Sequence, residues 1–316
     1  MIQRLIERSA VLVGSLAASS ILVFAFMAVL PGDPARVALG VNASDQAVAA
    51  LRAQFGLDRP LVSQYFSWAG GLLRLDPGQS YISRAPIGPQ ISDRLQVTLW
   101  LVVSSMVIAL VIALPMGTLM AVWHRRISGL VLSAVSQVGV AIPAFVAGIA
   151  LIALFAVKLG WLPANGWTPP AQDPVMFLKQ LALPALSLGL VQASVMTRYV
   201  RSSVLDVLRE DYLRTARAKG LRPMRALARH GLRNASVPVV TVLGLQLATL
   251  LIGAVVVERV FVIPGLGSLL LDAVASRDLI LVQDVVMVLV VAVLLVNFVV
   301  DLLYALIDPR MGREGR

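Results

Sequence analysis

Long apolar runs separated by shorter polar segments dominate the hydrophobic pattern of this chain. Several runs reach about twenty residues, the length that an α-helix needs to cross the hydrocarbon core of a bilayer. The first run is too long for a signal peptide and is not followed by a small-residue cleavage site, so a retained helix is expected. The pattern predicts an all-α integral membrane protein with six transmembrane helices, at residues 8–30, 95–123, 130–159, 178–199, 236–257 and 285–307.

The segment between the first two predicted spans has a helical pattern of its own. Ser44 suits the N-cap of a helix that runs to about Gln54, and Gly56 suits its end. A second, amphipathic helix is expected after Pro60, with aromatic side chains on one face that suit a membrane interface. Two uses remain open for this segment: a docking surface or lid, or an interfacial helix that closes the bundle. A further partly apolar helix is expected after the turn at residues 264–267.

The chain is accordingly expected to divide near residue 94. Residues 1–94 would hold the first transmembrane helix and a following segment with short amphipathic helices. Residues 95–316 would form a core transmembrane domain of five helices, with a basic loop at about residues 200–235.

Composition and charge support a membrane protein and set its expected orientation. Of the 316 residues, 58% are hydrophobic and 14% charged, and the formal net charge is +10. Basic residues gather at the ends of the predicted spans rather than in an aromatic-rich soluble domain, so nucleic acid is not an expected partner. With both termini in the cytoplasm, the inner segments hold seventeen Lys or Arg against six acidic residues, whereas the outer segments and span ends hold ten of each. The positive-inside rule therefore favours cytoplasmic termini.

The densest charge lies between the fourth and fifth predicted spans. Residues 198–233 contain ten Lys or Arg and three acidic residues. A plain cytoplasmic loop that touches anionic membrane lipid would explain this charge. The local pattern indicates more, because Gly220 suits a left-handed helix end and Pro223 suits the first turn of a second short helix.

Apolar residues recur at helical spacing within this basic segment. The small pair Thr215 and Ala216, together with Gly220, would let another backbone or a groove approach closely. We therefore expect a helix that docks onto a soluble partner. The apolar set is Leu205, Leu208, Tyr212, Leu213 and Ala216.

The chain lacks the motifs of several enzyme classes. None of its three lysines is followed by Ser or Thr, so no phosphate-binding P-loop is present. The absence of cysteine excludes disulfides and thiolate metal sites. His124 and His230 abut arginine-rich segments and are not expected to bind metal. No Ser-His-Asp order or paired intramembrane carboxylates indicate an intramembrane hydrolase.

A few polar side chains fall inside the predicted spans. Such residues usually face a bundle interior or a water-filled path, or they form hydrogen bonds between helices. Prolines at residues 115, 143 and 184 permit kinks in the second, third and fourth spans. The candidates for lining a translocation pathway are Gln137, Gln192, Gln246 and Asn297.

Several motifs occur together in this chain. In the basic loop they are residues 211–212, 214–220, 229–230 and 233–235, and elsewhere they are residues 30–34, 55–60, 142–145, 158–163, 260–261, 264–267 and 308–310. Together they resemble the permease subunit of a bacterial ATP-binding-cassette importer with the type I fold, and more narrowly the B-type subunit of the dipeptide/oligopeptide permease family, whose EAA loop the basic loop matches. Arg214 and Thr215 stand where Glu and Ala are usual in importers generally, which fits the peptide branch.

The resemblance implies a multi-pass subunit of the bacterial inner membrane that performs no hydrolysis itself. It would pair with a homologous C-type permease and with two ATP-binding subunits, which would hold ATP and Mg, while this chain holds no cofactor. An extracytoplasmic binding protein would deliver substrate, and the expected substrates are di- or oligopeptides, with nickel chelates, glutathione and oligosaccharides as alternatives. An ion-coupled secondary transporter and a scaffold without transport activity also stay open. The implied ATPase-coupling residues are Asp211, Tyr212, Arg214, Thr215, Ala216, Arg217, Lys219 and Gly220.

Overall fold

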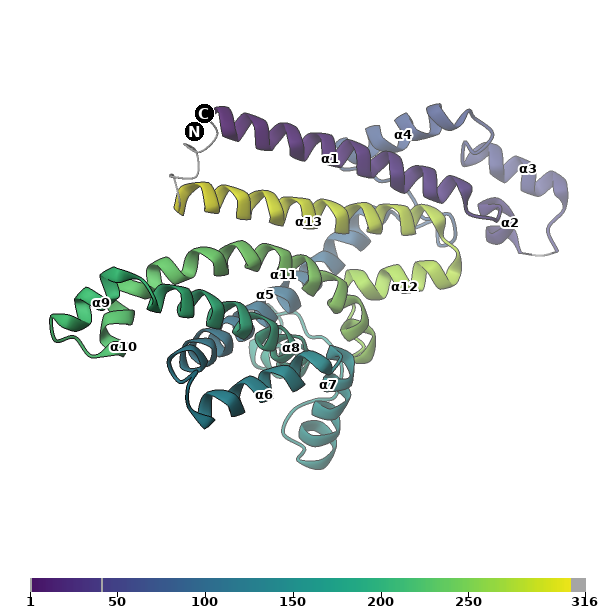
Figure 1. The fold of residues 1–316 in the computed structure, drawn as a ribbon. Coiled ribbons are helices and arrows are strands. Elements are labelled where there is room, and N and C mark those ends of the chain that lie inside the picture. The colour runs from purple at the N-terminus through teal and green to yellow at the C-terminus, as the bar shows by residue number, and fades with distance from the viewer. Residues whose placement is uncertain (1, 41, 308–316) are drawn as a thin grey trace. The chain divides into compact units, whose positions relative to one another are not determined.

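The computed structural model describes residues 2–40 and 42–307, and within these residues the fold is helical without a β-strand (Figure 1). The chain forms two compact units, each built from separate stretches of sequence. Unit 1 contains Met1–Thr98 and Pro264–Leu295, and unit 2 contains Leu99–Ile263 and Val296–Arg316. The expected functional division near residue 94 stays a prediction.

Unit 1 combines one long apolar helix with several short helices. Asp33 caps α2 by accepting a hydrogen bond from the Ala35 amide at 3.0 Å, and Pro34 occupies its first position. Ser44 caps α3, and Gly56 has a φ of +70° just after it, as predicted. The amphipathic helix after Pro60 is also confirmed. The helices are α1 (Ile2–Val29), α2 (Pro34–Leu39), α3 (Asp45–Gln54), α4 (Leu61–Leu73), the start of α5 (Ile87–Val122), α12 (Leu266–Ser276) and the start of α13 (Leu279–Ile307).

Two apolar clusters and a set of aromatic contacts hold unit 1 together. One cluster joins α5, α12 and α13 around Ile87, Leu266 and Val285, all of which are fully buried. A smaller one packs α2 on α3. Helix α4 lies on α1, where the Tyr65 and Ser20 hydroxyls are 2.9 Å apart. The aromatic residues of α4 therefore pack against α1 as well as facing outward.

Unit 2 is organised around α8, which packs against α6, α7 and α11. Small residues allow close contact between its helices: a Cβ added at Gly117 would lie 2.6 Å from the Val200 Cβ, and one at Gly189 would lie 2.8 Å from the Ile108 Cγ2. The unit contains the end of α5, α6 (Ile127–Ala141), α7 (Ala144–Leu151), a π-helix (Ile152–Lys158), α8 (Pro174–Leu208), α9 (Asp211–Ala218), α10 (Pro223–Ala226), a second π-helix (Leu227–Gly231), α11 (Leu232–Val260) and the end of α13.

Five helices in the described residues are long and apolar enough to cross a membrane, and a bent helix pair raises the number to six if it forms one span. The predicted span at residues 130–159 consists of two helices, because α6 and the helix that follows meet at 99° at the predicted Pro143 kink. Ile142 is extended, as expected of a residue before proline, and the Pro143 carbonyl starts the next helix. Pro115 and Pro184, in contrast, lie inside continuous helices.

Candidate functional site

Helix α9 occupies the predicted coupling segment, and its two ends have distinct backbone geometry. Glu210 is extended, with φ −66° and ψ 140°, so the chain leaves α8 before α9 begins. At the other end Gly220 has a φ of +91°, which confirms the predicted left-handed position. The Gly220 amide donates to the Arg217 carbonyl at 2.9 Å and the Leu221 amide to the Ala216 carbonyl at 3.3 Å. This pair of hydrogen bonds is a Schellman motif, and it stops the helix after two turns.

Buried apolar side chains hold α9 against the rest of unit 2. Leu213 is only 1% exposed and belongs to a cluster with Val204, Val207 and Leu227. Gly231 leaves room for this contact, because a Cβ there would lie 3.0 Å from the Val207 Cγ1 and 3.4 Å from the Leu213 Cδ1. Since Leu205, Leu208 and Ala216 also pack against the cluster, most of the predicted apolar set faces this chain rather than a partner.

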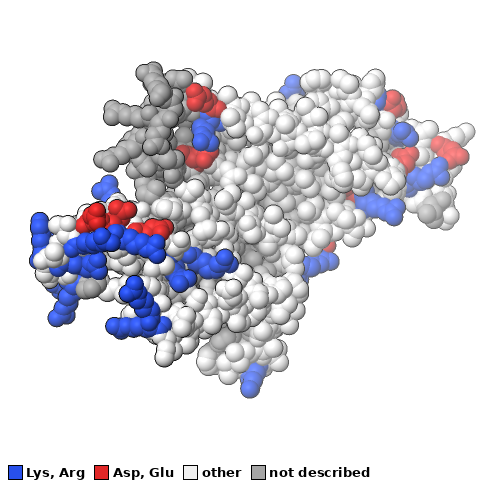
Figure 2. Space-filling model, viewed as in Figure 1, with Lys and Arg blue, Asp and Glu red and all other residues white. Residues whose placement is uncertain are grey.

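The face of α9 opposite Leu213 is exposed and polar. Asp211, Arg214, Thr215, Arg217, Lys219 and Gly220 are exposed, as is Tyr212, while Ala216 is half-buried. Arg214 pairs with Asp211 at 3.3 Å, and the Asn234 amide donates to the Tyr212 hydroxyl at 3.0 Å. Figure 2 shows many Lys and Arg side chains, with a smaller acidic group, at the end of unit 2 that contains α9 and α10. This surface is suited to a charged partner or an anionic lipid surface.

The predicted pathway residues fall into three different environments. The Gln192 side chain on α8 donates to the Gln246 side-chain oxygen on α11 at 2.6 Å, so these two form a bond between helices. Gln137 is exposed on α6, and Asn297 is half-buried on α13. The structure therefore brings together two of the four candidates, and lining of a pathway stays a prediction for all of them.

Two buried carboxylates in unit 1 were missed from the sequence. The Asp284 carboxylate accepts a hydrogen bond from the Trp68 indole at 2.7 Å. The Asp278 carboxylate accepts from the Ser80 hydroxyl and from the Tyr81 amide, the latter at 3.2 Å. Both acids were counted only as charges outside the membrane, although their place between two apolar helices was a signal that they could be buried. They tie α4 and residues 80–81 to the start of α13.

The described residues contain no group of three His, Cys, Asp or Glu side chains that could hold a metal ion. The His124 ring makes a local contact with the backbone, in which its Nδ1 lies 2.8 Å from the Ala121 carbonyl oxygen.

Comparison with known proteins gives matches over nearly the whole chain. Residues 113–313 match the family described as "Binding-protein-dependent transport system inner membrane component", and residues 1–102 match the corresponding N-terminal family. The glutathione transport system permease protein GsiC of Escherichia coli strain K12 is 42% identical over 312 residues, which cover 98% of both chains. GsiC of Salmonella choleraesuis strain SC-B67 is 43% identical with the same coverage.

A solved structure of the MetNI methionine ABC transporter in an inward-facing conformation shares the fold. Its TM-score is 0.57 at 21% identity, and the match covers 69% of this chain and 96% of the other. At this identity the match shows the fold alone.

Proposed function

This chain belongs to the inner-membrane permease family of binding-protein-dependent ABC importers, and from this premise we propose that it couples ATP hydrolysis by partner subunits to the import of short peptides. Membership confirms the resemblance found in the sequence, and with it the type I importer fold and a transport role in the inner membrane.

Helix α9 is proposed as the coupling helix, seated in a groove of an ATPase subunit. The single observation that carries this proposal is the division of its surface, with Leu213 buried in its own chain while the polar face is open. An anchored helix moves with α8 and α11, and its exposed face is free to bind. Movement of the ATPase subunits would therefore be passed to these two membrane helices.

The proposed assembly contains a second, C-type permease, two ATP-binding subunits that hold ATP and Mg, and an extracytoplasmic binding protein. The basic surface around α9 and both termini would lie in the cytoplasm, as the positive-inside rule favours. Residues 95–316 would form the core permease domain. Gln192, Gln246, Gln137 and Asn297 are proposed to line the pathway.

The proposed substrate class is di- or oligopeptides, including glutathione-like tripeptides. The relatives named as glutathione transport permeases support this choice, because they are 42% identical or more over almost the full chain. Analysis of the ligand that copurifies with the cognate binding protein tests it. Recovery of a nickel chelate or an oligosaccharide would contradict the peptide assignment and leave the importer role intact.

The coupling proposal is tested by the substitution Gly220→Val. A Cβ at Gly220 would meet no atom within 4 Å, so the substitution acts only through the backbone, whose φ of +91° disfavours a β-branched residue. The expected local strain is about 1 kcal/mol or more, enough to displace α9 without unfolding the helical core. In lipid vesicles containing the complete complex, substrate-loaded binding protein should no longer stimulate ATP hydrolysis, and uptake should fall.

Gly160→Val is the matched control, because Gly160 also has a positive φ, of +64°, and open space around its Cβ position. It should assemble and transport normally, since the same kind of strain lies away from α9. Normal coupling in Gly220→Val would show that this loop is only a basic membrane tether.

A further inference from the structure

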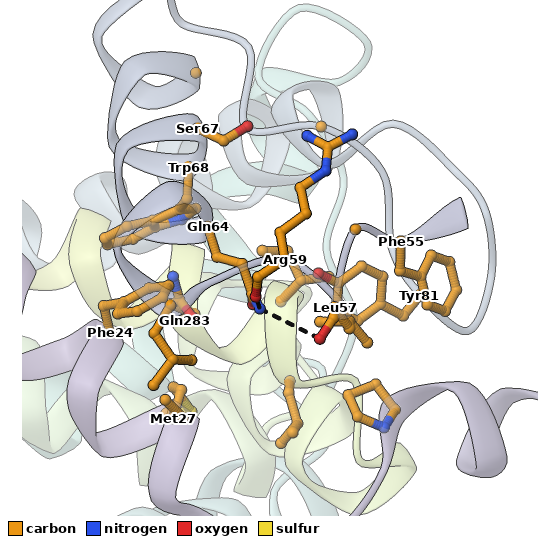
Figure 3. Close-up of a pocket in the computed structure, with 18 of the residues that line it drawn as sticks. Phe24, Met27, Phe55, Leu57, Arg59, Gln64, Ser67, Trp68, Tyr81 and Gln283 are labelled. Carbon is orange, nitrogen blue, oxygen red and sulfur yellow. Dashed lines mark hydrogen bonds between the residues drawn. The ribbon is translucent and has the colours of Figure 1, made fainter. Parts of the chain in front are cut away.

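Charged side chains are mixed in the cavity of unit 1 but carry a single sign along one stretch of unit 2. Figure 3 shows the cavity, of about 530 Å³, whose lining contains both acidic and basic side chains, with Asp33 paired to Arg52 at 3.4 Å. The cavity therefore favours neither an anion nor a cation. In unit 2, by contrast, residues 222–257 contain no Asp or Glu. Four arginines lie there before the candidate membrane span Pro238–Val260, at positions 222, 225, 229 and 233.

A π-helix places three of these arginines in a row. The helix α10, the π-helix Leu227–Gly231 and α11 follow one another without a break in the helical backbone. The wider turn of a π-helix keeps residues that are four positions apart closer to one face than an α-helix does. Arg225, Arg229 and Arg233 have this spacing, and all three are exposed. We call these three residues the arginine row.

The arginine row faces away from α9. Leu227, Gly231 and Ala235 are buried and lie two positions after the three arginines, which places them on the opposite side of the helix. This buried side faces α9, because Leu227 shares a cluster with Leu213 and a Cβ at Gly231 would lie 3.4 Å from the Leu213 Cδ1. The open face of α9 lies opposite Leu213, so a partner seated on it leaves the arginine row uncovered.

The arginine row has no anionic partner among the residues that the structure describes. None of its three guanidinium groups forms an ion pair there, whereas Arg214 on α9 pairs with Asp211 at 3.3 Å. Positive charges that share one exposed helix face attract anionic groups and disfavour cationic ones. The row is therefore suited to an anionic partner outside this part of the chain.

The position of the row along α11 indicates which anion it meets. Arg233 lies five residues before Pro238, where the candidate span begins, which is about 8 Å along the helix axis. The headgroup region on each side of a bilayer is roughly 5 to 8 Å thick. Arg229 is about 6 Å farther out, and a long arginine side chain can bend back toward the membrane surface over this distance. Phospholipid phosphates are therefore the anions nearest to these two side chains.

We propose that the arginine row binds anionic phospholipid in the cytoplasmic leaflet. Arg229 and Arg233 donate hydrogen bonds to headgroup phosphates, for which the paired N–H donors of a guanidinium group are well suited. Arg225 lies farther out and adds attraction within the range of the surface potential. The contact keeps the start of α11 at the membrane surface while it moves with α9. Assignment to the cytoplasmic leaflet rests on the proposed orientation.

The test measures lipid preference at the row itself, in the complete complex of permeases and ATPase subunits with no other cysteine. Ala228→Cys carries a fluorophore at an exposed position beside Arg229. The complex is placed in phosphatidylcholine nanodiscs that contain either phosphatidylglycerol or phosphatidylcholine with a spin label near the headgroup. Spin-labelled phosphatidylglycerol should quench the fluorophore with a preference of about fivefold or more, because one arginine near an anionic surface contributes about a factor of five.

Paired substitutions show whether the preference comes from the row. Arg229→Gln combined with Arg233→Gln should remove most of it, and raised salt should reduce it in the unmodified row. Arg125→Gln combined with Arg126→Gln is the matched control, because it removes the same charge from two exposed arginines between α5 and α6 of the same unit. This control should keep the full preference.

Equal quenching by the two lipids in a complex that transports would overturn the proposal. An unchanged preference in the row variant, or an equal loss in the control, would also overturn it. If the row variant instead loses an ATPase subunit during purification and quenching does not depend on lipid charge, the row binds that subunit and the lipid assignment is wrong. These outcomes leave the coupling role of α9 standing, because Gly220→Val tests that role separately.

Discussion

Helix α9 in unit 2 and residues 80–81 in unit 1 are both short segments held against long helices, but different forces hold them. Leu213 fixes α9 by apolar contact, while nearly all of the helix's polar groups face outward. Ser80 and Tyr81 are fixed by hydrogen bonds to the buried Asp278 carboxylate. Trp68 and Asp284 add a second bond of this kind nearby in the same unit.

This difference in forces implies that α9 can shift in position, whereas residues 80–81 are held in a fixed position. Apolar contact has no preferred direction, so a helix seated by it tolerates small displacements. Hydrogen bonds to a buried carboxylate depend strongly on distance and angle, and breaking one leaves a costly unsatisfied group. We therefore expect α9 to respond to a moving partner and the segment at residues 80–81 to keep a fixed shape.

The largest effect is expected from Asp278→Ala. This change leaves the Ser80 hydroxyl and the Tyr81 amide without their hydrogen-bond acceptor. It should lower the free energy of unfolding of unit 1 by about 3 to 4 kcal/mol. Hydrogen exchange at residues 78–86 should accelerate accordingly. Asp93→Ala removes an exposed carboxylate of the same unit and should have little effect. Equal protection of residues 78–86 in both variants would contradict the fixed-segment interpretation.

A somewhat smaller loss of stability is expected from Leu213→Ala. Truncation of this buried side chain should cost about 3 kcal/mol of local stability, because α9 has few other buried contacts. Amides of α9 should lose protection from exchange, and stimulation of the ATPase subunits should fall, while α8 stays protected. Leu232→Ala, at a leucine that is 42% exposed, is the control. Unchanged protection of α9 would show that Leu213 does not hold it.

The smallest of the three effects is expected from Trp68→Phe. Phenylalanine keeps an aromatic ring but removes the indole donor to Asp284, so the free energy of unfolding of unit 1 should fall by about 2 kcal/mol. The unfolding midpoint should drop, whereas Trp161→Phe, at an exposed tryptophan, should leave it unchanged. Asp284→Ala and the double variant complete a double-mutant cycle. If the loss of unfolding free energy in the double variant equals the sum of the losses in the two single variants, the bond between Trp68 and Asp284 contributes no stability.

Local signals in the sequence predicted several helix ends. Ser44, Gly56, Gly220 and Pro223 act at the helix ends where they were expected, because capping depends on a few neighbouring residues. Helix α2 was missed, although an aspartate followed by proline is a recognisable helix start. The bend at Pro143 was foreseen only as a kink, since its angle of 99° depends on packing.

Contacts between distant parts of the chain could not be predicted. Trp68 and Asp284 are 216 positions apart, so no local pattern indicates that they meet. Periodicity correctly identified an apolar set around α9 but not the surface that it contacts. Leu213 could have faced a partner, and the structure shows that it faces its own chain.

The most direct measurement of the central claim is crosslinking from α9 to the ATPase subunits. The chain has no cysteine, so Arg214→Cys, Arg217→Cys and Leu213→Cys each introduce a single thiol. In the assembled complex, a short bifunctional thiol reagent should link positions 214 and 217 to an ATPase subunit that carries a single cysteine in its groove, and ATP should change the yield. Position 213 should not react, because its side chain is buried. A transporting complex that gives no link from 214 or 217, or an equal link from 213, would contradict the assignment of α9 as the coupling helix.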